Sequence, residues 1–274
     1  MRKSVLITGC STGIGRATAL AFARAGLPTY ASARRLDTIE DLSAAGCRLL
    51  QLDVTDESSM TRAVATVEAE CGSVGALINN AGYAEAAPME EVTMAAIRKQ
   101  FDTNVFGLLR LCQLVLPRMR ELGAGTIVNV GSVGGLITAP AAGAYHMTKY
   151  SLEALSDALR IEVRGFGIGV VLLEPDGVRT QFPMTAAATM PRDVPGPYDG
   201  LKASHAEVLA SSYRDGARGL LSPEAVAKVA VKAVTSTRPR ARYRIGLQAR
   251  FAPGLRRLVG DRGWDSLMAR MFPA

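Results

Sequence analysis

The sequence predicts an α/β protein built on a doubly wound parallel sheet of about seven strands, with helices on both faces. Short apolar runs alternate with longer segments in which apolar residues recur at helical spacing. A glycine-rich turn follows the first run, at the end of a strand where sheets of this kind bind ligands. The expected strands lie at residues 5–8, 29–33, 48–52, 76–79, 126–130, 168–173 and 242–245.

Helices are expected between these strands, each with one apolar face. Gly26, Gly46 and Gly123 stand where helices should end, because the backbone after a helix often turns left-handed. No Pro/Gly/Ser-rich linker separates two halves, so we expect a single domain over residues 1–274. The expected helices span residues 14–25, 38–45, 57–70, 94–122, 145–164 and 223–235.

The composition is that of a soluble globular protein, with 48% hydrophobic and 21% charged residues among 274. Membrane spans need about 18 or more consecutive apolar residues, and the sequence contains no such run. Residues 1–4 lead directly into the first strand, so no secretion signal is expected. The four cysteines are far apart, with no Cys-x-x-Cys and no histidine pair nearby, which predicts reduced thiols, a cytoplasmic location and no metal site.

The formal net charge of +7 raises the question of a polyanionic partner. The basic residues concentrate late, at 238–250 and 256–257, which favours a solvated basic surface that attracts an anionic cofactor over a nucleic-acid site. A basic amphipathic helix is expected at about residues 253–272, with Leu255, Leu258, Leu267 and Met271 on it. We expect this helix to pack against protein, with binding to a membrane surface as the alternative.

Residues 178–221 form the one long stretch in which no regular structure is expected. The stretch carries several methionines and the prolines at 183, 191, 195 and 197. Long loops in compact domains are usually functional or disordered. We therefore interpret this segment as a lid over the substrate.

The turn after the first strand predicts a dinucleotide site. It reads Thr-Gly-Cys-Ser-Thr-Gly-Ile-Gly from residue 8 to residue 15 and opens a helix. Glycines let the backbone approach a pyrophosphate closely, and the helix N-terminus offers free N–H groups and partial positive charge. The residues expected to contact the cofactor here are Gly9, Ser11, Thr12, Gly13, Ile14 and Gly15.

The end of the second strand favours NADP(H) over NAD(H). An NAD enzyme places an acid about 20 residues beyond the glycines, to bind the ribose hydroxyls. Arg34 stands at that position instead, and a guanidinium suits a 2′-phosphate. The alternative is that Arg34 is an ordinary surface arginine at a helix entry.

Two further segments end strands at the same edge of the sheet. Asp53 and Val54 follow the third strand, and Asn79-Asn80-Ala81-Gly82 closes the fourth. We expect Asp53, Val54, Asn80, Ala81 and Gly82 to contact the cofactor, although Asn-Asn-Ala-Gly is also a common kind of tight turn.

A possible acid/base group lies at the start of the helix at 145–164. Tyr145 and Lys149 are four residues apart, which places them about one turn apart on one helix face. A phenol needs about 4 kcal/mol of preference for its anion to titrate near pH 7, and one ammonium at about 4 Å supplies that much. Ser132 follows the fifth strand, where its hydroxyl can hold a substrate oxygen, and Asn104 interrupts a long helix, where a kink holding a water is expected.

Taken together, these motifs resemble the short-chain dehydrogenase/reductase superfamily in its compact form, over nearly the whole chain. The resemblance implies a Rossmann-type fold. It also implies that Tyr145 moves the carbonyl proton, Ser132 holds the substrate oxygen, Lys149 binds ribose and lowers the tyrosine pKa, and Asn104 holds a relay water. Family pattern further places Pro175, Val178 and Thr180 beside the nicotinamide. One departure is Asp176, inserted before Gly177, which we expect to crowd or polarise the nicotinamide pocket.

The resemblance implies an NADP(H)-dependent oxidoreductase that interconverts a carbonyl compound and an alcohol, and that forms a homodimer or homotetramer. Residues 7–11 and 131–136 are similar to the 17β-hydroxysteroid and retinol dehydrogenase branch, which implies an apolar substrate. Two alternatives are a non-catalytic protein that senses NADP and a reductase of acyl-thioester ketones. His146, although adjacent to the tyrosine, is expected to be structural because neighbouring helix positions diverge by about 100°. Trp264 is expected to serve packing.

Overall fold

The computed structural model describes residues 3–191, 195–213 and 219–273. Its core is a seven-stranded sheet in the order β3-β2-β1-β4-β5-β6-β7, with every neighbouring pair parallel. This is the doubly wound, Rossmann-type topology expected, with its reversal of strand order between β1 and β4. The strands are β1 (Val5–Ile7), β2 (Thr29–Ala33), β3 (Arg48–Gln51), β4 (Ala76–Asn79), β5 (Gly125–Val130), β6 (Ile168–Pro175) and β7 (Arg242–Ile245).

Helices connect the strands close to where the sequence predicts them. The first part of the chain holds α1 (Gly13–Arg24), the 3-10 segment η1 (Leu36–Ala45) and α2 (Glu57–Cys71). The middle holds α3 (Met94–Phe101), η2 (Asp102–Phe106), α4 (Gly107–Glu121), η3 (Val133–Gly135), α5 (Gly143–Glu162) and η4 (Arg164–Phe166). The last part holds α6 (Phe182–Ala187), α7 (Asp199–Tyr213), α8 (Pro223–Thr235) and α9 (Leu247–Met271).

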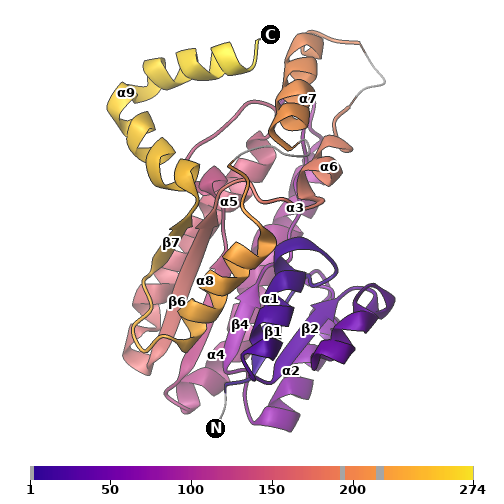
Figure 1. The fold of residues 1–274 in the computed structure, drawn as a ribbon, viewed down its shortest axis with the longest axis vertical. Helices are drawn as coiled ribbons and strands as arrows, with labels where there is room; N and C mark the ends of the chain where they lie inside the picture. Colours follow the sequence, from indigo (N-terminus) through magenta and orange to yellow (C-terminus); the bar gives the residue numbers. More distant parts are fainter. Residues whose placement is uncertain (1–2, 192–194, 214–218, 274) are drawn as a thin grey trace.

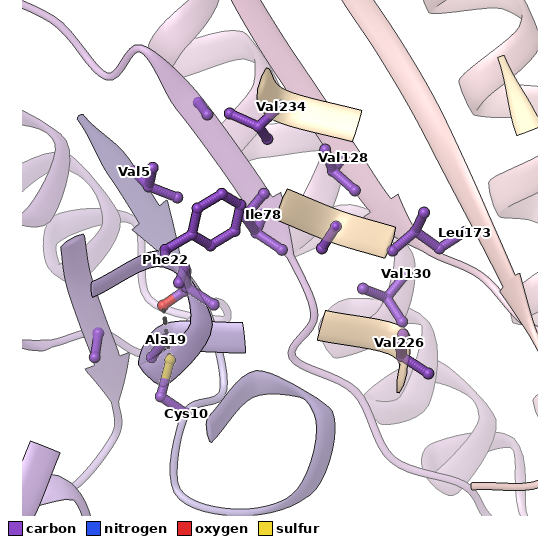
Figure 2. Packing of buried hydrophobic residues seen from close by; sticks show 14 of the residues in the cluster. Val5, Cys10, Ala19, Phe22, Ile78, Val128, Val130, Leu173, Val226 and Val234 are labelled. Carbon is purple, nitrogen blue, oxygen red and sulfur yellow. Dashed lines mark hydrogen bonds between the residues drawn. The ribbon is translucent and has the colours of Figure 1, made fainter. Parts of the chain in front are cut away.

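The side chains of β1 alternate between two apolar clusters, one on each face of the sheet. Val5 and Ile7 belong to an apolar cluster shared with α1 and α8, whereas Leu6 belongs to a cluster shared with α2, α4 and α5. Figure 2 shows Phe22 of α1 and Val226 of α8 packed on the first of these faces. Helices on both faces bury the central strands, while the edge strands β3 and β7 stay partly exposed. The ends of the central strands are therefore the places where polar side chains can gather.

The long crossover between β4 and β5 is continuous but irregular. The sequence predicts one helix at 94–122, and the structure divides it at η2, a π-helical turn that contains Asn104. Such turns insert one extra residue per turn and are frequent at functional sites. The interruption expected at Asn104 thus takes the form of a π-helical turn, and the water expected there stays a prediction.

The segment at 178–221 was expected to be irregular, but it contains the two helices α6 and α7. In α7 the apolar residues do not concentrate on one face, so the periodicity that marks the other helices is missing from the sequence. Ala203, Ala206 and Ala210 still favour a helix there. Residues 192–194 and 214–218 of the expected lid lie outside the described residues.

The C-terminal helix α9 begins earlier than expected, at Leu247, and extends away from the sheet with a kink at Gly260 (Figure 1). Trp264 is buried, as expected, but the four apolar residues expected to pack are not: the exposed fractions of Leu255, Leu258, Leu267 and Met271 run from 37% to 84%. The expectation of packing is therefore wrong for these residues within one chain. Among the described residues, no helix combines the length and apolar content needed to span a bilayer.

Candidate active site

The glycine-rich turn and the Asn79–Gly82 segment fit against each other at the switch point between β1 and β4. Gly9 has a φ of +72°, which favours glycine, and a side chain at Gly15 would begin 2.2 Å from the Gly9 carbonyl oxygen. Asn80 fastens the turn, since its Nδ2 donates to the carbonyl oxygens of Thr8 at 2.9 Å and Gly9 at 3.0 Å. Thr8 Oγ1 accepts from the backbone N–H of Asn80 and of Ala81. The two segments that the sequence singled out therefore form one unit.

The N-terminus of α1 borders a pocket of about 500 Å³. Thr12 occupies the N-cap without a side-chain capping bond, so the first N–H groups of the helix have no side-chain partner there. Sequence reasoning did not single out two arginines of the lining, Arg16, which is ion-paired with Asp41, and Arg179. The lining residues are Ser11, Thr12, Gly13, Arg16, Ala17, Leu20, Arg179, Thr180, Gln181, Pro223 and Glu224.

The predicted selector of the 2′-phosphate lies at the end of β2. Arg34 is exposed, and no ion pair joins its guanidinium to a residue in the described part of the chain. Its neighbour Arg35 is paired with Asp37. Asp53 lies at the same edge, where its Oδ1 accepts from the backbone N–H of Thr55 at 2.9 Å and from the Thr55 hydroxyl at 2.7 Å. An unpaired guanidinium beside this edge is the arrangement that an extra phosphate needs.

Not every predicted cofactor contact presents its side chain to the site. The side chains of Val54 and Val178 are buried in the two apolar clusters. Gly82 packs against Asn104, with the position of an added Cβ lying 3.1 Å from Asn104 Oδ1. Val54 and Val178 therefore offer backbone groups to a ligand rather than side chains.

Tyr145 and Ser132 come together at the carboxyl edge of β5. Ser132 follows β5 and caps η3, where its Oγ accepts from the backbone N–H of Gly134 at 3.0 Å. The Ser132 side chain lies beside the partly buried Tyr145 and favours the ionised form of its phenol. Burial outweighs this effect and raises the pKa of Tyr145 to about 12. The phenol therefore keeps its proton at neutral pH in this structure.

Lys149 lies one turn further along α5, near the phenol. Its side chain is buried, its Nζ donates to the Val130 carbonyl oxygen at 2.8 Å, and Nζ lies 5.7 Å from the centre of the Tyr145 ring. Burial also lowers the pKa of Lys149 to about 8. In this structure burial dominates the pKa of Tyr145, so the effect of Lys149 on that pKa stays a prediction.

Asn104 connects the π-helical turn to α5. Its Oδ1 accepts from the backbone N–H of Tyr83 at 3.0 Å, and its Nδ2 donates to the Tyr83 carbonyl at 2.8 Å and to Thr148 Oγ1 at 3.1 Å. The Thr148 hydroxyl in turn donates to the Tyr145 carbonyl at 2.8 Å. Sequence reasoning missed Thr148 and Tyr83, which carried no motif of their own. These bonds hold the start of α5, and hence Tyr145, against the loop after β4.

His146 is structural, as expected. Its Nδ1 lies 2.8 Å from the Gly134 carbonyl oxygen, and its Nε2 accepts from the backbone N–H of Ala139 at 3.0 Å. With Nε2 accepting, Nδ1 is the nitrogen that donates. The ring therefore fixes the loop between Ser132 and Tyr145, which sets the distance between those two side chains.

Asp176 turns away from the pocket that it was expected to crowd. Its Oδ1 accepts from the backbone N–H of Gly177 at 2.7 Å, and its Oδ2 accepts from the backbone N–H of Gln248 at 2.9 Å, in the first turn of α9. Asp176 was expected to affect the nicotinamide pocket, but in this structure its side chain caps α9, a helix from another part of the chain. Thr180 reaches the phosphate turn, with its Cγ2 2.9 Å from the position of a Cβ at Gly13.

The fold and this set of residues belong to one family of enzymes. Residues 3–191 match the family model of short chain dehydrogenases, and the chain belongs to that family. It is 37% identical over 269 residues to the Escherichia coli oxidoreductase YbbO, covering 98% of this chain and 94% of that protein. It is 36% identical over 178 residues to a 3-ketodihydrosphingosine reductase of Bacteroides thetaiotaomicron, covering 65% of each.

Solved structures agree. A short-chain dehydrogenase from Streptomyces avermitilis has a TM-score of 0.80 at 32% identity, covering 97% of both chains. A serine dehydrogenase complexed with NADP+ has a TM-score of 0.77 at 25% identity, covering 89% of this chain and 94% of that one. A short-chain dehydrogenase from Burkholderia phymatum in complex with NAD has a TM-score of 0.80 at 26% identity, covering 94% of both. The chain is therefore an oxidoreductase of a family whose members bind NAD or NADP.

Proposed function

We propose that this protein is an NADP(H)-dependent oxidoreductase that interconverts a ketone or aldehyde and an alcohol on an apolar substrate. The observation that supports it best is that Ser132 and Tyr145 lie beside each other at the sheet edge that also carries the glycine turn. One hydroxyl to hold a substrate oxygen and one phenol to exchange a proton with it are the polar groups that carbonyl reduction requires.

The residues at the switch point fit a dinucleotide. At Gly9 and Gly15 a Cβ would meet backbone within 3 Å, so the turn packs against itself and against the Asn79–Gly82 segment only because both are glycine. We propose that this turn and the N-terminus of α1 hold the pyrophosphate, Arg34 the 2′-phosphate, and Lys149 the nicotinamide ribose. We further propose that Asp53, Val54, Asn80, Ala81 and Gly82 line the adenosine side, and Pro175, Val178 and Thr180 the nicotinamide side.

The side chains have distinct roles in the proposed reaction. The bound nicotinamide supplies or accepts the hydride. Ser132 holds the carbonyl oxygen, and Tyr145 donates its phenolic proton to that oxygen in the reducing direction. The phenol is protonated at neutral pH, and a proton donor must carry its proton at working pH. Asn104 holds the start of α5 in place, through Thr148.

The proposed cofactor preference and substrate class have support outside the site. One structural relative binds NADP+ and another binds NAD, so the unpaired guanidinium of Arg34 decides the proposal for NADP. The related 3-ketodihydrosphingosine reductase acts, by its name, on a ketone with a long apolar chain. Phe182 packs on the Tyr145 ring at 5.5 Å between centroids, which places an apolar wall beside the phenol.

Further parts of the proposal concern the whole molecule. We propose one domain over the chain, residues 178–221 as the lid, and a homodimer or homotetramer as the working form. The cysteines are free in the structure, and Cys10, Cys47 and Cys112 are buried, which supports a reducing, cytoplasmic setting.

A panel of apolar ketones, aldehydes and alcohols, followed by nicotinamide absorbance with NADPH and with NADH, tests the proposal. We expect reduction of ketones with NADPH, and we expect Tyr145→Phe to lower kcat by at least about 100-fold while cofactor still binds. Unchanged turnover in that variant would remove the proposed acid. Binding of NADPH without turnover on any carbonyl would favour an NADP sensor, and preference for acyl thioesters would favour a lipid-synthesis reductase.

A further inference from the structure

A second pocket lies between the lid helices, apart from the phosphate turn. Its volume is about 210 Å³, room for about seven water molecules at their share of liquid volume. The wall is mostly apolar, but two side chains from the inner face of α7 interrupt it. The lining residues are Ala187, Met190, Lys202, Ala203, His205 and Ala206.

Among the lining residues, His205 has a ring nitrogen whose hydrogen-bonding capacity is not met by the described part of the chain. Its side chain is 7% exposed, and its Nδ1 has no hydrogen-bond partner among the described residues. Phe272 stacks on the ring, with centroids 6.1 Å apart and planes 26° apart, which fixes the ring without satisfying its nitrogen. A buried polar atom without a partner destabilises the folded state, so a partner is expected from the pocket that the ring lines.

Helix α6 runs from the reacting groups to the pocket. Phe182, at the start of this helix, packs on Tyr145, and Ala187, at its end, lines the pocket. Five residues of helical rise separate the two, about 8 Å along the axis. A substrate whose carbonyl lies at Tyr145 would have to extend about this far along α6 to place its far end beside His205.

Lys202 does not make this pocket a site for an anion. Its Nζ lies 2.7 Å from Glu91 Oε2 and 3.5 Å from Asp199 Oδ1, so two carboxylates already face one ammonium. Burial and the neighbouring His146 lower the pKa of His205, which leaves its imidazole neutral. A neutral imidazole offers one donor and one acceptor, and a hydroxyl matches either nitrogen because it can donate and accept.

We propose that this pocket is the far end of the substrate site, and that His205 hydrogen-bonds a hydroxyl group remote from the reacting carbonyl of an otherwise apolar substrate. The inference rests on the proposed function and deepens it. It assigns His205 as a specificity-determining residue and names the substrate class: an apolar carbonyl compound with a second, distant hydroxyl.

Kinetics on matched probes test the proposal. The probes are 2-alkanones of about eight to fourteen carbons, long enough to span about 8 Å, that end in a methyl, a hydroxyl or a carboxylate. At one chain length we expect the hydroxyl probe to exceed the methyl probe in kcat/KM by about tenfold, the effect of one well-placed hydrogen bond. His205→Phe should bring that ratio to about one by lowering kcat/KM for the hydroxyl probe, whereas Glu207→Gln, exposed on the same helix, should preserve the ratio.

A second measurement does not depend on turnover. The chain has only two histidines, so ring nitrogen NMR gives two sets of signals, and His205→Phe assigns them. Without cofactor, the hydroxyl probe should shift the His205 Nδ1 signal, and the methyl probe should leave it in place. If ketones are reduced but neither ratio nor signal depends on the hydroxyl, or if the carboxylate probe is preferred, this inference is wrong and the proposed function stands. If no ketone is reduced, the proposed function fails, and the NMR titration alone decides whether the pocket binds a hydroxyl.

Discussion

Lys149 donates a hydrogen bond to the carbonyl oxygen of Val130, so that a helix residue is tied to the end of β5 from inside the protein. The ammonium has left water for a position with one backbone acceptor, and burial lowers its pKa to about 8. This contact orients the lysine beside the phenol without any bond to it. It also makes the folded state sensitive to pH.

We predict that Lys149 stabilises the folded state as pH rises. The pKa of this lysine is about 8 in the folded protein and 10.5 in the unfolded chain. Between these two pH values the unfolded chain holds the proton more tightly than the folded protein does, so raising the pH favours folding. From pH 7 to pH 9.5 the contribution to the free energy of unfolding is about 2 kcal/mol. Urea unfolding at both pH values should show this gain in the wild type relative to Lys149→Met. Equal pH dependence in the two proteins would contradict the assigned pKa.

Arg34 is expected to select the cofactor. Arg34→Asp removes a guanidinium with no ion-pair partner in the described chain and places a carboxylate where ribose hydroxyls would lie. NADPH affinity should fall by at least about tenfold, and NADH affinity should rise, in fluorescence titrations. Arg35→Ala is the matched control, because Arg35 is already paired with Asp37. If Arg35→Ala weakens NADPH binding and Arg34→Asp does not, the assignment of Arg34 fails.

Asp176 is expected to stabilise α9 rather than tune the cofactor. Asp176→Ala removes the acceptor for the Gln248 N–H and should lower the free energy of unfolding by about 1 kcal/mol. Hydrogen exchange at the first turn of α9 should become faster, with NADPH affinity changed less than about twofold. Asp265→Ala, exposed on the same helix, should change neither. Lost affinity with unaltered exchange would restore the role at the nicotinamide pocket.

The ion pair between Lys202 and Glu91 is expected to hold α7 closed over the site. Their side chains are 10% and 23% exposed, so removing the ammonium leaves a carboxylate poorly solvated. Lys202→Met should make the lid about tenfold more susceptible to limited proteolysis. Asp199→Asn should have a small effect, because Asp199 is half exposed and its oxygen is 3.5 Å away. Identical cleavage rates in wild type and Lys202→Met would exclude this role.

The sheet and the order of the motifs were predictable because both are one-dimensional patterns. The apolar runs match strand positions closely, since strands buried on both faces are apolar throughout. The π-helical turn at Asn104 was predictable as a kink because a mid-helix asparagine has no local role. Ser132 and Tyr145 were paired correctly, since both follow β5 at one sheet edge.

Direction and burial of side chains were not predictable, because they depend on contacts between distant residues. The sequence places Lys149 next to Tyr145, but it does not show the Val130 carbonyl 2.8 Å away. Asp176 precedes a glycine in the nicotinamide segment, and its partner Gln248 is 72 residues later. His205 carried no motif, and only the stacked Phe272 and the pocket reveal its buried nitrogen.

The fastening of Gly9 by Asn80 has a consequence for how tightly a dinucleotide is held. Because the turn is already locked by protein contacts, little conformational entropy remains to be lost when a phosphate docks. Recognition at this end of the molecule is therefore preorganised.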